Sequence, residues 1–466
     1  MSPRANSPSN WKDARVAVVG LARSGISACT FLQRRGARVT GIDLRPGSDL
    51  GPSIEELSAS GVETSFGAYP NLAEFDALVL SPGVDPLQDA IATARTRGVR
   101  VVPELELGAL ETKGRLVCIT GTKGKSTTTL SLHAMLSEAG LDARAVGNIG
   151  EPITAHVEGS NEETVFVIEA SSFQLETTER FHPDCAVFLN LFPDHLDRHP
   201  SFETYAAAKA RIFANQTRDD IAIVNQEDER AMDLAGRTPA HIIPFRPRTI
   251  PDASRPGPIA YFENQKAILR EKDALQIALF HEADIQIPGF AVRSNLLAAA
   301  TAASSLGVPD SCIGASVRKF KGVPHTFEKL GEVRGVTFFN DSKATTLESV
   351  EVALRSFESP VLAIMGGRLK AGSFASLRDA VGQHVRAIYA IGESRGLVRD
   401  ALKDACPVHE FSTLEAAVYE AHRAARPGDT ILLAPGCSSF DMFRDYAERG
   451  DAFKRAFNHL FLQGAA

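Results

Sequence analysis

The chain has 466 residues, of which 44% are hydrophobic and 23% are charged, a composition typical of globular proteins. A chain of this length exceeds what one hydrophobic core usually holds, and it predicts about three domains. The formal net charge of -7 argues against a dedicated nucleic-acid-binding protein, which usually carries a basic face.

Neither a membrane span nor an export signal is expected. No apolar run approaches the ~20 residues that a membrane-spanning helix needs, and the N-terminus lacks the apolar core of a signal peptide. The six cysteines show no metal-type spacing, which is typical of reduced thiols. We therefore expect a soluble, cytoplasmic protein without stable membrane insertion.

The first predicted unit opens with a strand at 15–19, a glycine turn at 20–25, a helix to about residue 35 and a second strand that ends at Asp43. This order begins a nucleotide-binding fold and places Asp43 where it could meet a ribose or a base. Ala22 replaces the middle glycine of the dinucleotide fingerprint, so NAD binding and a plain strand-to-helix turn both stay open. Further strands are expected at 77–80 and 99–102, with a boundary at Pro103.

The stretch 115–130 predicts a short phosphate loop. An apolar strand precedes the glycines at 121–124, and a helix begins at Lys125. Glycines let backbone N–H groups approach phosphate oxygens, and a helix N-terminus adds unpaired N–H groups and a positive dipole end. Lys125 would reach the β- and γ-phosphates, while Ser126 or Thr127 would help to hold Mg²⁺.

The phosphate loop is shorter than the general pattern. Ile119 stands where that pattern has its first glycine, so the match is to G-T-x-G-K-S. A glycine- and threonine-rich turn that binds nothing is the alternative. We favour nucleotide binding because a strand and a helix flank the turn as the mechanism requires.

Polar residues follow the next predicted strands. A strand at 164–168 ends in Glu169, where a carboxylate would face the phosphate site and could hold Mg²⁺; an exposed strand end is the alternative. A strand at 185–189 leads into a loop with two carboxylates and two histidines, which could supply metal ligands or acid–base groups: Asp194, His195, Asp197 and His199. The helix expected at 205–213 carries Lys209, which residue types alone predict to be a solvated charge.

The C-terminal third predicts another α/β unit. Strands are expected at 336–339, 361–365, 387–391 and 430–433, and a helix at 295–306 precedes them. Most loops at the carboxyl ends of these strands contain Gly, Ser or Lys. Open α/β sheets bind ligands at that edge, so we expect a binding site there.

These stretches, in this order, resemble the Mur ligase family, and most closely its glutamate-adding members. The resemblance covers nearly the whole chain and rests on G-T-K-G-K-S-T-T, G-N-I-G, E-A-S-S-F-Q-L-E-T, D-H-L-D-R, A-A-K-A-R-I-F, G-V-P-H-T-F-E, N-D-S-K-A-T and S-S-F-D-M-F-R-D-Y-A-E-R-G-D-A-F. It implies an α/β fold with a Rossmann-like UDP-substrate-binding domain at 1–103, a central P-loop ATPase-type domain at 104–321 and a Rossmann-like glutamate-binding domain at 322–466.

Carried over position by position, the resemblance implies the residues of each site. The phosphate loop falls on Gly121, Thr122, Lys123, Gly124, Lys125, Ser126 and Thr127, and the adenine and ribose contacts fall on Asn295 and Asp341. Magnesium ligands fall on Ser126, Glu169 and His195, beside the lysine that the family carbamylates, Lys209. Contacts to the UDP end of the substrate fall on Arg23, Ser24, Asp43 and Arg45, and further substrate contacts fall on Asn148 and Ser171. Contacts to the amino acid fall on Lys343, Thr345, Lys370 and Ser439.

Three positions depart from the family pattern. Lys123 stands where the glutamate ligases often have Asn, which adds positive charge beside the triphosphate. Thr326 follows His325 where an Arg is usual, and the segment 289–295 lacks the His-Asn pair that usually ends at the adenine-contacting Asn.

The implied reaction is amide formation in peptidoglycan synthesis by a monomeric ligase. Its substrates are ATP with Mg²⁺, UDP-N-acetylmuramoyl-L-alanine and glutamate. The reaction proceeds through an acyl-phosphate intermediate, and the resemblance implies that Lys125, His195 and Lys209 are the catalytic residues. Residue types do not fix the handedness of the glutamate, so D-glutamate rests on the resemblance alone. A folylpolyglutamate-type ligase, a P-loop ATPase switch and an oxidoreductase remain as alternatives.

Overall fold

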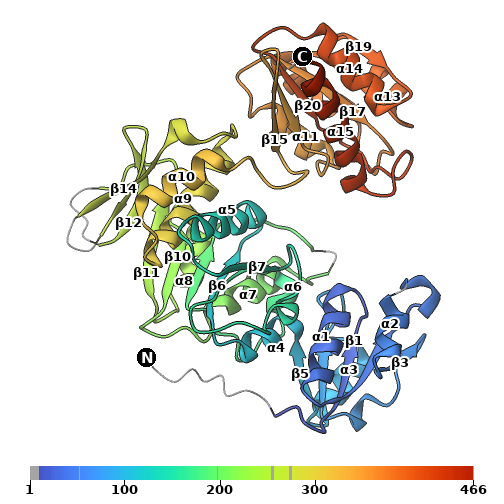
Figure 1. The fold of residues 1–466 in the computed structure, drawn as a ribbon, viewed down its shortest axis with the longest axis vertical. Coiled ribbons are helices and arrows are strands. Elements are labelled where there is room, and N and C mark those ends of the chain that lie inside the picture. The colour runs from blue at the N-terminus through green and yellow to red at the C-terminus, as the bar shows by residue number, and fades with distance from the viewer. Residues whose placement is uncertain (1–9, 52, 197, 253–256, 272–274, 465–466) are drawn as a thin grey trace. The chain divides into compact units, whose positions relative to one another are not determined.

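The computed structural model describes residues 10–51, 53–196, 198–252, 257–271 and 275–464. These residues form three mainly parallel sheets with helices between their strands (Figure 1). The chain divides into two compact units, one of Met1–Glu282 with Ser294–Val317 and one of Ala283–Arg293 with Arg318–Ala466. Within the described ranges, no helix has both the length and the apolar character needed to cross a membrane.

The first sheet has five parallel strands in the order β3-β2-β1-β4-β5. Strand order changes direction between β1 and β4, so the loops after these two strands meet at one crevice, and Ser81 Oγ donates to Gly20 O at 2.6 Å there. The sequence pattern does not reveal β3, since none of its side chains is fully buried. The elements are β1 (Arg15–Val19), α1 (Arg23–Arg34), β2 (Arg38–Asp43), α2 (Ser53–Ala59), β3 (Glu63–Phe66), β4 (Ala77–Leu80), α3 (Asp89–Thr96) and β5 (Arg100–Pro103).

The second sheet has nine strands in the order β14-β13-β12-β11-β10-β9-β6-β8-β7. Its strands are β6 (Arg115–Thr120), β7 (Ala143–Gly147), β8 (Val165–Glu169), β9 (Cys185–Phe188), β10 (Ile221–Asn225), β11 (His241–Arg246), β12 (Ile259–Glu263), β13 (Lys266–Arg270) and β14 (Gln276–His281). Its helices are α4 (Glu104–Glu111), α5 (Lys125–Glu138), α6 (Ser172–Leu175), α7 (Phe202–Ala210), α8 (Glu229–Ala235), α9 (Phe290–Ser305) and α10 (Asp310–Lys319).

Strands β6, β8 and β9 form the buried centre of this sheet. Their apolar runs are covered on both faces, as a parallel sheet between helices requires. Because β6 lies between β8 and β9, the phosphate loop after β6 has the ends of both neighbours beside it.

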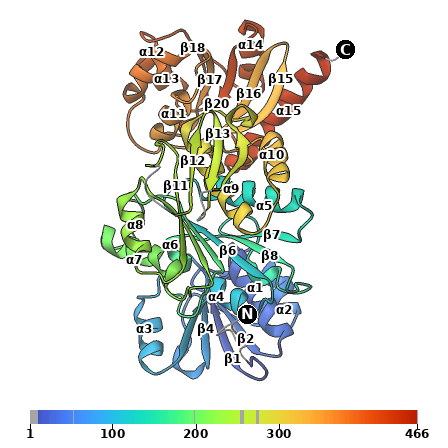
Figure 2. The ribbon, with the colours of Figure 1, turned by 90° about the vertical axis from the view of Figure 1, so that its left-hand side faces the viewer.

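An antiparallel extension of the second sheet was not expected from the sequence. Figure 2 shows β11, β12 and β13 side by side, and β12 and β13 form a hairpin. Its two turn residues, Asn264 and Gln265, have positive φ values of 49° and 60°. Asn-Gly is the dipeptide that usually indicates such a turn, so the Asn-Gln of this chain does not predict the hairpin.

The third sheet has six strands in the order β15-β16-β20-β17-β18-β19, and only β15 is antiparallel to its neighbour. Buried apolar residues cover both of its faces, and the segment 283–293 contributes Ile287 to one of these cores. The elements are β15 (Glu328–Val333), β16 (Val336–Asn340), α11 (Leu347–Leu354), β17 (Val361–Gly366), α12 (Arg378–His384), β18 (Val385–Ile391), α13 (Arg395–Leu402), β19 (Val408–Glu410), α14 (Leu414–Ala424), β20 (Thr430–Leu433) and α15 (Tyr446–Gly464).

Candidate active site

The phosphate loop joins β6 to α5 through two glycines with positive φ, 150° at Gly121 and 90° at Gly124. Nζ of Lys125 curls back over the loop and donates to the carbonyl oxygens of Gly121 at 3.0 Å and Thr122 at 2.9 Å. Carbonyl oxygens thus hold this ammonium group at the mouth of the loop. Ser126 and Thr127 lie half-buried in the first turn of α5, as the sequence predicts.

Two side chains from other segments shape the loop. Oδ1 of Asn190 accepts from the backbone N–H groups of Thr122 at 3.1 Å and Lys123 at 2.9 Å. The buried amide of Asn295 lies on the other side, where a Cβ on Gly124 would meet its Oδ1 at 2.3 Å. The expected adenine contact Asn295 therefore lies against the phosphate loop itself, and Gly124 can only be glycine here.

Glu169 lies at the end of β8 and is 2% exposed, so the alternative of an exposed strand end is wrong. Its Oε1 accepts from Nδ2 of Asn148 at 2.7 Å, which brings together two residues expected at the site. Its Oε2 is buried and has no hydrogen-bond partner among the described residues. A buried carboxylate oxygen without a partner is costly, so this atom is suited to receive a cation or an ordered water.

Lys209 is 1% exposed, so its interpretation as a solvated charge is wrong. Its Nζ donates to Gly121 O at 2.8 Å and lies 4.9 Å from the centre of the Tyr205 ring. The same Gly121 oxygen accepts from Lys125, so two ammonium groups share one carbonyl. Burial, together with the nearby charge of Lys125, lowers the pKa of Lys209 to about 7.

The sequence around Lys209 itself indicates that this end of the helix is buried. Alanines precede and follow this lysine in α7, so the end of the helix has little polar surface to face water. Glu203 and Thr204 at the start of the helix are exposed, whereas Tyr205, Ala208 and Lys209 are buried. The alanines around Lys209 are therefore a local indication that this lysine is buried.

His195 lies in the loop that follows β9 and is exposed, with a positive φ of 55°. Its ring makes an edge contact with Phe173 at 5.0 Å between ring centres. Its neighbour Asp194 forms an ion pair with Lys123 at 3.3 Å. Burial opposes the charge on Asp194, but Lys123 and His195 lower the pKa of this carboxyl. The added charge of Lys123 is thus balanced by Asp194.

The other polar residues of this loop differ in position. His199 is buried, with Nε2 2.9 Å from Ser172 Oγ and its ring stacked on Phe173. It therefore packs the loop onto α6. Asp197 lies outside the described residues. Among the residues that are described, no three His, Cys, Asp or Glu side chains converge as a metal centre.

The residues expected at the UDP end lie around the first sheet. Nη1 of Arg23 donates to Gly150 O at 3.0 Å, and Ser24 is half-buried beside it. Asp43 accepts from the backbone N–H of Leu21 at 2.9 Å and pairs with Arg45 at 2.9 Å. Burial would raise the pKa of Asp43, but its bonds with Arg45 lower it to about 2. Both oxygens of the Asp43 carboxylate thus already accept hydrogen bonds from within the protein.

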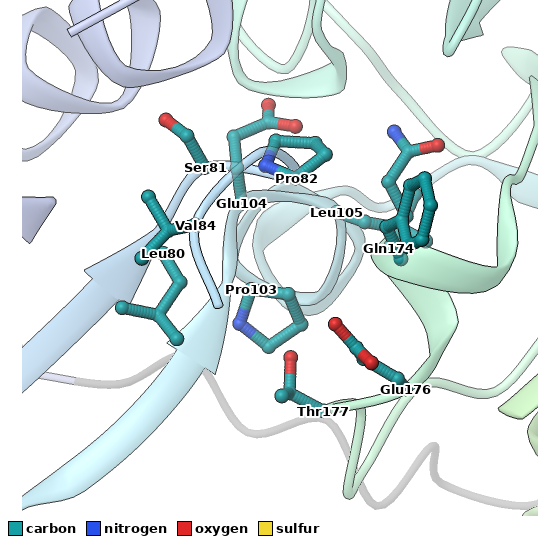
Figure 3. Close-up of a pocket in the computed structure, with 11 residues that line it drawn as sticks. Leu80, Ser81, Pro82, Val84, Pro103, Glu104, Leu105, Gln174, Glu176 and Thr177 are labelled. Carbon is teal, nitrogen blue, oxygen red and sulfur yellow. The ribbon is translucent and has the colours of Figure 1, made fainter. Parts of the chain in front are cut away.

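A cavity of about 10 Å³, near the volume one water molecule needs, lies between the loop after β4 and α6 (Figure 3). Gln174 and Glu176 line the side opposite Leu80. Oε1 of the buried Glu104 accepts from Thr154 Oγ1 at 2.7 Å, whereas its Oε2 has no partner in the described part of the chain. Burial raises the pKa of Glu104 to about 7. Sequence reasoning missed this residue because it reads as part of an ordinary helix start.

Ser171 lies near this cavity and caps α6. Its Oγ accepts from Gln174 N at 3.3 Å, and Oε1 of Gln174 accepts from Ser171 N at 3.0 Å. This reciprocal pair fixes the start of the short helix. The hydroxyl expected to contact substrate is therefore engaged locally.

The residues expected to contact the amino acid gather at the carboxyl edge of the third sheet. Nζ of Lys370 donates to Thr345 Oγ1 at 3.2 Å, so two of these residues meet. Ser439 is buried in the loop after β20, and the exposed Lys343 has its Nζ 6.0 Å from the centre of the Tyr446 ring. Asp341 is also buried, which raises its pKa to about 7, and it accepts from Phe327 N at 3.0 Å.

Comparison with known families gives three matches along the chain. Residues 14–103 match the Mur ligase MurD-like N-terminal domain, residues 119–303 the Mur ligase middle domain, and residues 327–437 the Mur ligase glutamate ligase domain. The fold is also similar to the UDP-N-acetylmuramate-alanine ligase MurC from Thermotoga maritima, with a TM-score of 0.56, 17% identity and coverage of 96% of this chain and 99% of that one.

Two curated relatives are similar over almost their whole length. The UDP-N-acetylmuramoylalanine--D-glutamate ligase of Acidobacterium capsulatum is 41% identical over 446 residues, 95% of this chain and 96% of that protein. The protein of the same name from Solibacter usitatus is 40% identical over 446 residues, 96% of this chain and 98% of that protein.

Three α/β sheets with a phosphate loop in the middle one define a nucleotide-binding enzyme of several domains. The chain belongs to the Mur ligase family, and within it to the homologues of the D-glutamate-adding ligases. The family and the three-domain α/β fold expected from the sequence are confirmed.

Proposed function

We propose that this chain joins D-glutamate to UDP-N-acetylmuramoyl-L-alanine in peptidoglycan synthesis, with the release of ADP and phosphate. The observation that carries this function is the group at the end of β6, where Lys125 and Lys209 share the Gly121 oxygen. An ATPase switch would not need the second pair of lysines, Lys343 and Lys370, which follow strands of the third sheet. We assign the UDP end to residues 1–103, ATP to 104–321 and glutamate to 322–466.

The reaction requires an activated carboxylate, because an amine does not attack a free carboxylate. An oxygen of the substrate carboxylate bonds to the γ-phosphorus of ATP, and the bond from that phosphorus to the β,γ-bridging oxygen breaks as ADP leaves. The α-amine of glutamate then attacks the carbonyl carbon, phosphate departs, and the nitrogen loses a proton. Lys125 supplies positive charge to the phosphoryl oxygens throughout, and Lys123, which is exposed and paired with Asp194, makes a smaller contribution.

The site is suited to Mg²⁺, because the buried Oε2 of Glu169 lacks a partner and Mg²⁺ prefers oxygen ligands. Ser126, Glu169, His195 and modified Lys209 are the residues that would hold it. When bound, the ion would neutralise phosphate charge. Asn148 would keep the Glu169 carboxylate oriented through its 2.7 Å bond.

We further propose that Lys209 is carbamylated. Two cations on one carbonyl repel each other, and burial disfavours a charged Lys209, so this amine loses its proton readily. The nitrogen lone pair of the neutral amine attacks the carbon of CO₂, and the nitrogen releases a proton to give a carbamate. The product replaces a repelled cation with an anion, which suits a position beside Lys125 and a metal.

The remaining site residues divide between substrates. Lys343, Thr345, Lys370 and Ser439 would bind the glutamate carboxylates, because two ammonium groups and two hydroxyls lie at the ends of adjacent strands. Asn295 and Asp341 would contact the nucleoside of ATP. The UDP substrate would meet Arg23, Ser24, Asp43, Arg45, Asn148 and Ser171.

Phosphate release tests this function directly. The full chain, given ATP, Mg²⁺ and UDP-N-acetylmuramoyl-L-alanine, should release phosphate with D-glutamate and far less with L-glutamate, and mass spectrometry should find the extended nucleotide. Omission of either acceptor or amino acid should stop sustained release. Rapid release that ignores both would identify an ATPase switch, and equal use of both stereoisomers would reject the D-specific assignment.

A further inference from the structure

The guanidinium of Arg449 is buried beneath the loops of the proposed glutamate site. This residue lies on α15 and is 1% exposed. Its Nε donates to Ser342 Oγ at 3.0 Å and its Nη2 to Ser342 O at 2.8 Å. Its Nη1 and Nη2 both lie 3.1 Å from Cys437 O. All of these partners are carbonyl or hydroxyl oxygens, and none is a carboxylate.

These bonds join loops that follow adjacent strands. Ser342 follows β16 and directly precedes Lys343, whereas Cys437 follows β20 and stands two residues before Ser439. The loop after β17 also approaches, since a Cβ on Gly367 would lie 3.3 Å from Nη1 of Arg449. Because β16, β20 and β17 are neighbours in the sheet, one side chain bonds to two of the loops that carry the proposed glutamate contacts and lies against the third.

The Arg449 side chain also keeps its positive charge although it is buried. Burial lowers the pKa of Arg449 to about 10, which leaves the group charged at neutral pH. The hydrogen-bond partners of this cation are neutral oxygens, and the carboxylate of Asp441 balances only part of its charge from a distance without a hydrogen bond, so the remaining field extends into the loops above. Glutamate brings two carboxylates, so a fixed positive charge beneath its site favours binding.

We propose that Arg449 is a positioning residue for the incoming glutamate: it ties the loops after β16 and β20 together beneath the loop after β17 and supports the positive potential that receives the amino acid. This inference rests on the proposed function, because it requires Lys343, Lys370 and Ser439 to bind glutamate. A purely structural Arg449 would stabilise the fold without a selective effect on the amino acid.

Three variants of the full chain test this role. Arg449→Met removes the charge and all four bonds, and Arg449→Lys keeps the charge but not the planar fork. Ser342→Ala removes the bond from Arg449 Nε and also the bond that Ser342 Oγ donates to Tyr446 O at 2.7 Å. We expect Arg449→Met to raise the KM for D-glutamate roughly tenfold to a hundredfold, as a displaced binding group does. Arg449→Lys should fall between it and the unaltered protein, and the KM values for ATP and the UDP substrate should not change.

A matched control is Arg386→Met, which breaks the pair that the half-buried Arg386 forms with the buried Asp429 at the opposite end of β20. It should lower the melting temperature without raising the KM for D-glutamate. If Arg449→Met fails to fold, Arg449→Lys and Ser342→Ala carry the test. An unchanged glutamate KM in the folded variants, or an equal rise for all three substrates, would overturn the positioning role.

Lys370→Ala separates this inference from the proposed function. If Lys370→Ala raises the glutamate KM and the Arg449 variants do not, only the role of Arg449 is lost. If neither change affects the glutamate KM, the glutamate site itself is wrongly assigned.

Discussion

Lys125 and Lys209 both donate to the carbonyl oxygen of Gly121, but their surroundings suit them to different roles. Lys125 begins α5 at the mouth of the loop, so it can leave Gly121 for a phosphate. Lys209 is enclosed by Tyr205 and the end of β6, so it cannot turn to solvent. The charge of Lys125 suits phosphate, whereas Lys209 is suited to modification.

Lys125→Ala should lower kcat by roughly 10³-fold, because it deletes the cation that the loop directs at the transferred phosphoryl group. The measurement is steady-state phosphate release with all three substrates. Lys123→Ala is the control, since that side chain is 77% exposed and already pairs with Asp194, and its effect should be much smaller. Turnover near that of the unaltered protein in Lys125→Ala would reject the phosphate-loop role.

Lys209→Ala should be nearly inactive if Lys209 is carbamylated as proposed, because the change removes the amine that would carry the carbamate. Small carboxylic acids such as acetate should restore part of the activity by supplying the missing oxygens in the cavity that the truncation leaves. A carbamate signal in ¹³C NMR after exposure to labelled CO₂ should appear in the unaltered protein and be absent from Lys209→Ala. Full activity of Lys209→Ala without additives would exclude a role for this side chain.

At the scale of elements, α4 links the first and second sheets through buried carboxyl groups. Glu104 bonds to Thr154, and Oε2 of Glu106 accepts from the backbone N–H groups of Glu179, Arg180 and Phe181. Oε2 of Glu106 thus has three donors, whereas Oε2 of Glu104 has no partner in the described part of the chain.

Glu104→Gln should stabilise the protein at pH 8 and have little effect at pH 5. Burial raises the pKa of Glu104 from its ordinary 4.5 to about 7, so the folded chain keeps a proton that the unfolded chain releases. This stabilising contribution is complete below pH 4.5 and is lost as the pH rises through 7, on the order of 3 kcal/mol for a fully buried group.

Melting temperatures of Glu104→Gln and the unaltered protein across pH 5 to 8 measure this effect. The glutamine keeps an acceptor for Thr154 and cannot ionise. Glu55→Gln, at an exposed position on α2, serves as the control and should leave the pH dependence of melting unchanged. Parallel curves for Glu104→Gln and the unaltered protein would show that Glu104 does not titrate in this range.

For the whole molecule, the chain crosses between its two compact units more than once. The segment Ala283–Arg293 belongs to the C-terminal unit, although Ser294–Val317 belongs to the other. Ile287 of this segment is 3% exposed and packs in the core that contains Phe339 and Leu347. The C-terminal unit therefore depends on residues that precede α10.

Ile287→Ala should destabilise the C-terminal unit by about 2–5 kcal/mol, because it empties a buried site next to Gly322. Limited proteolysis should then cut the region after residue 318 first, and D-glutamate should slow that cleavage. Ile250→Ala, at an exposed position, is the control and should leave the cleavage pattern unchanged. Equal resistance of Ile287→Ala and the unaltered protein would place Ile287 outside that core.

Local patterns in the sequence were sufficient to predict much of this molecule. The apolar runs of β1, β4, β6 and β20 and the glycines of the phosphate loop were predicted because backbone geometry and burial on both faces leave a local signature. The place of Glu169 at a strand end followed from the same rule. The family resemblance then supplied roles that residue types alone do not.

Only the tertiary structure decided which polar groups are buried and which of them meet. Lys209 shares an oxygen with Lys125 across more than 80 residues of chain, Glu169 retains a carboxylate oxygen without a partner, and Arg449 reaches Ser342 from 107 residues away. Such contacts depend on the packing of distant segments, which a local pattern does not record. Burial then lowers the pKa of Lys209 and of Arg449, because the free energy of an ionised group depends on the water and dipoles that surround it.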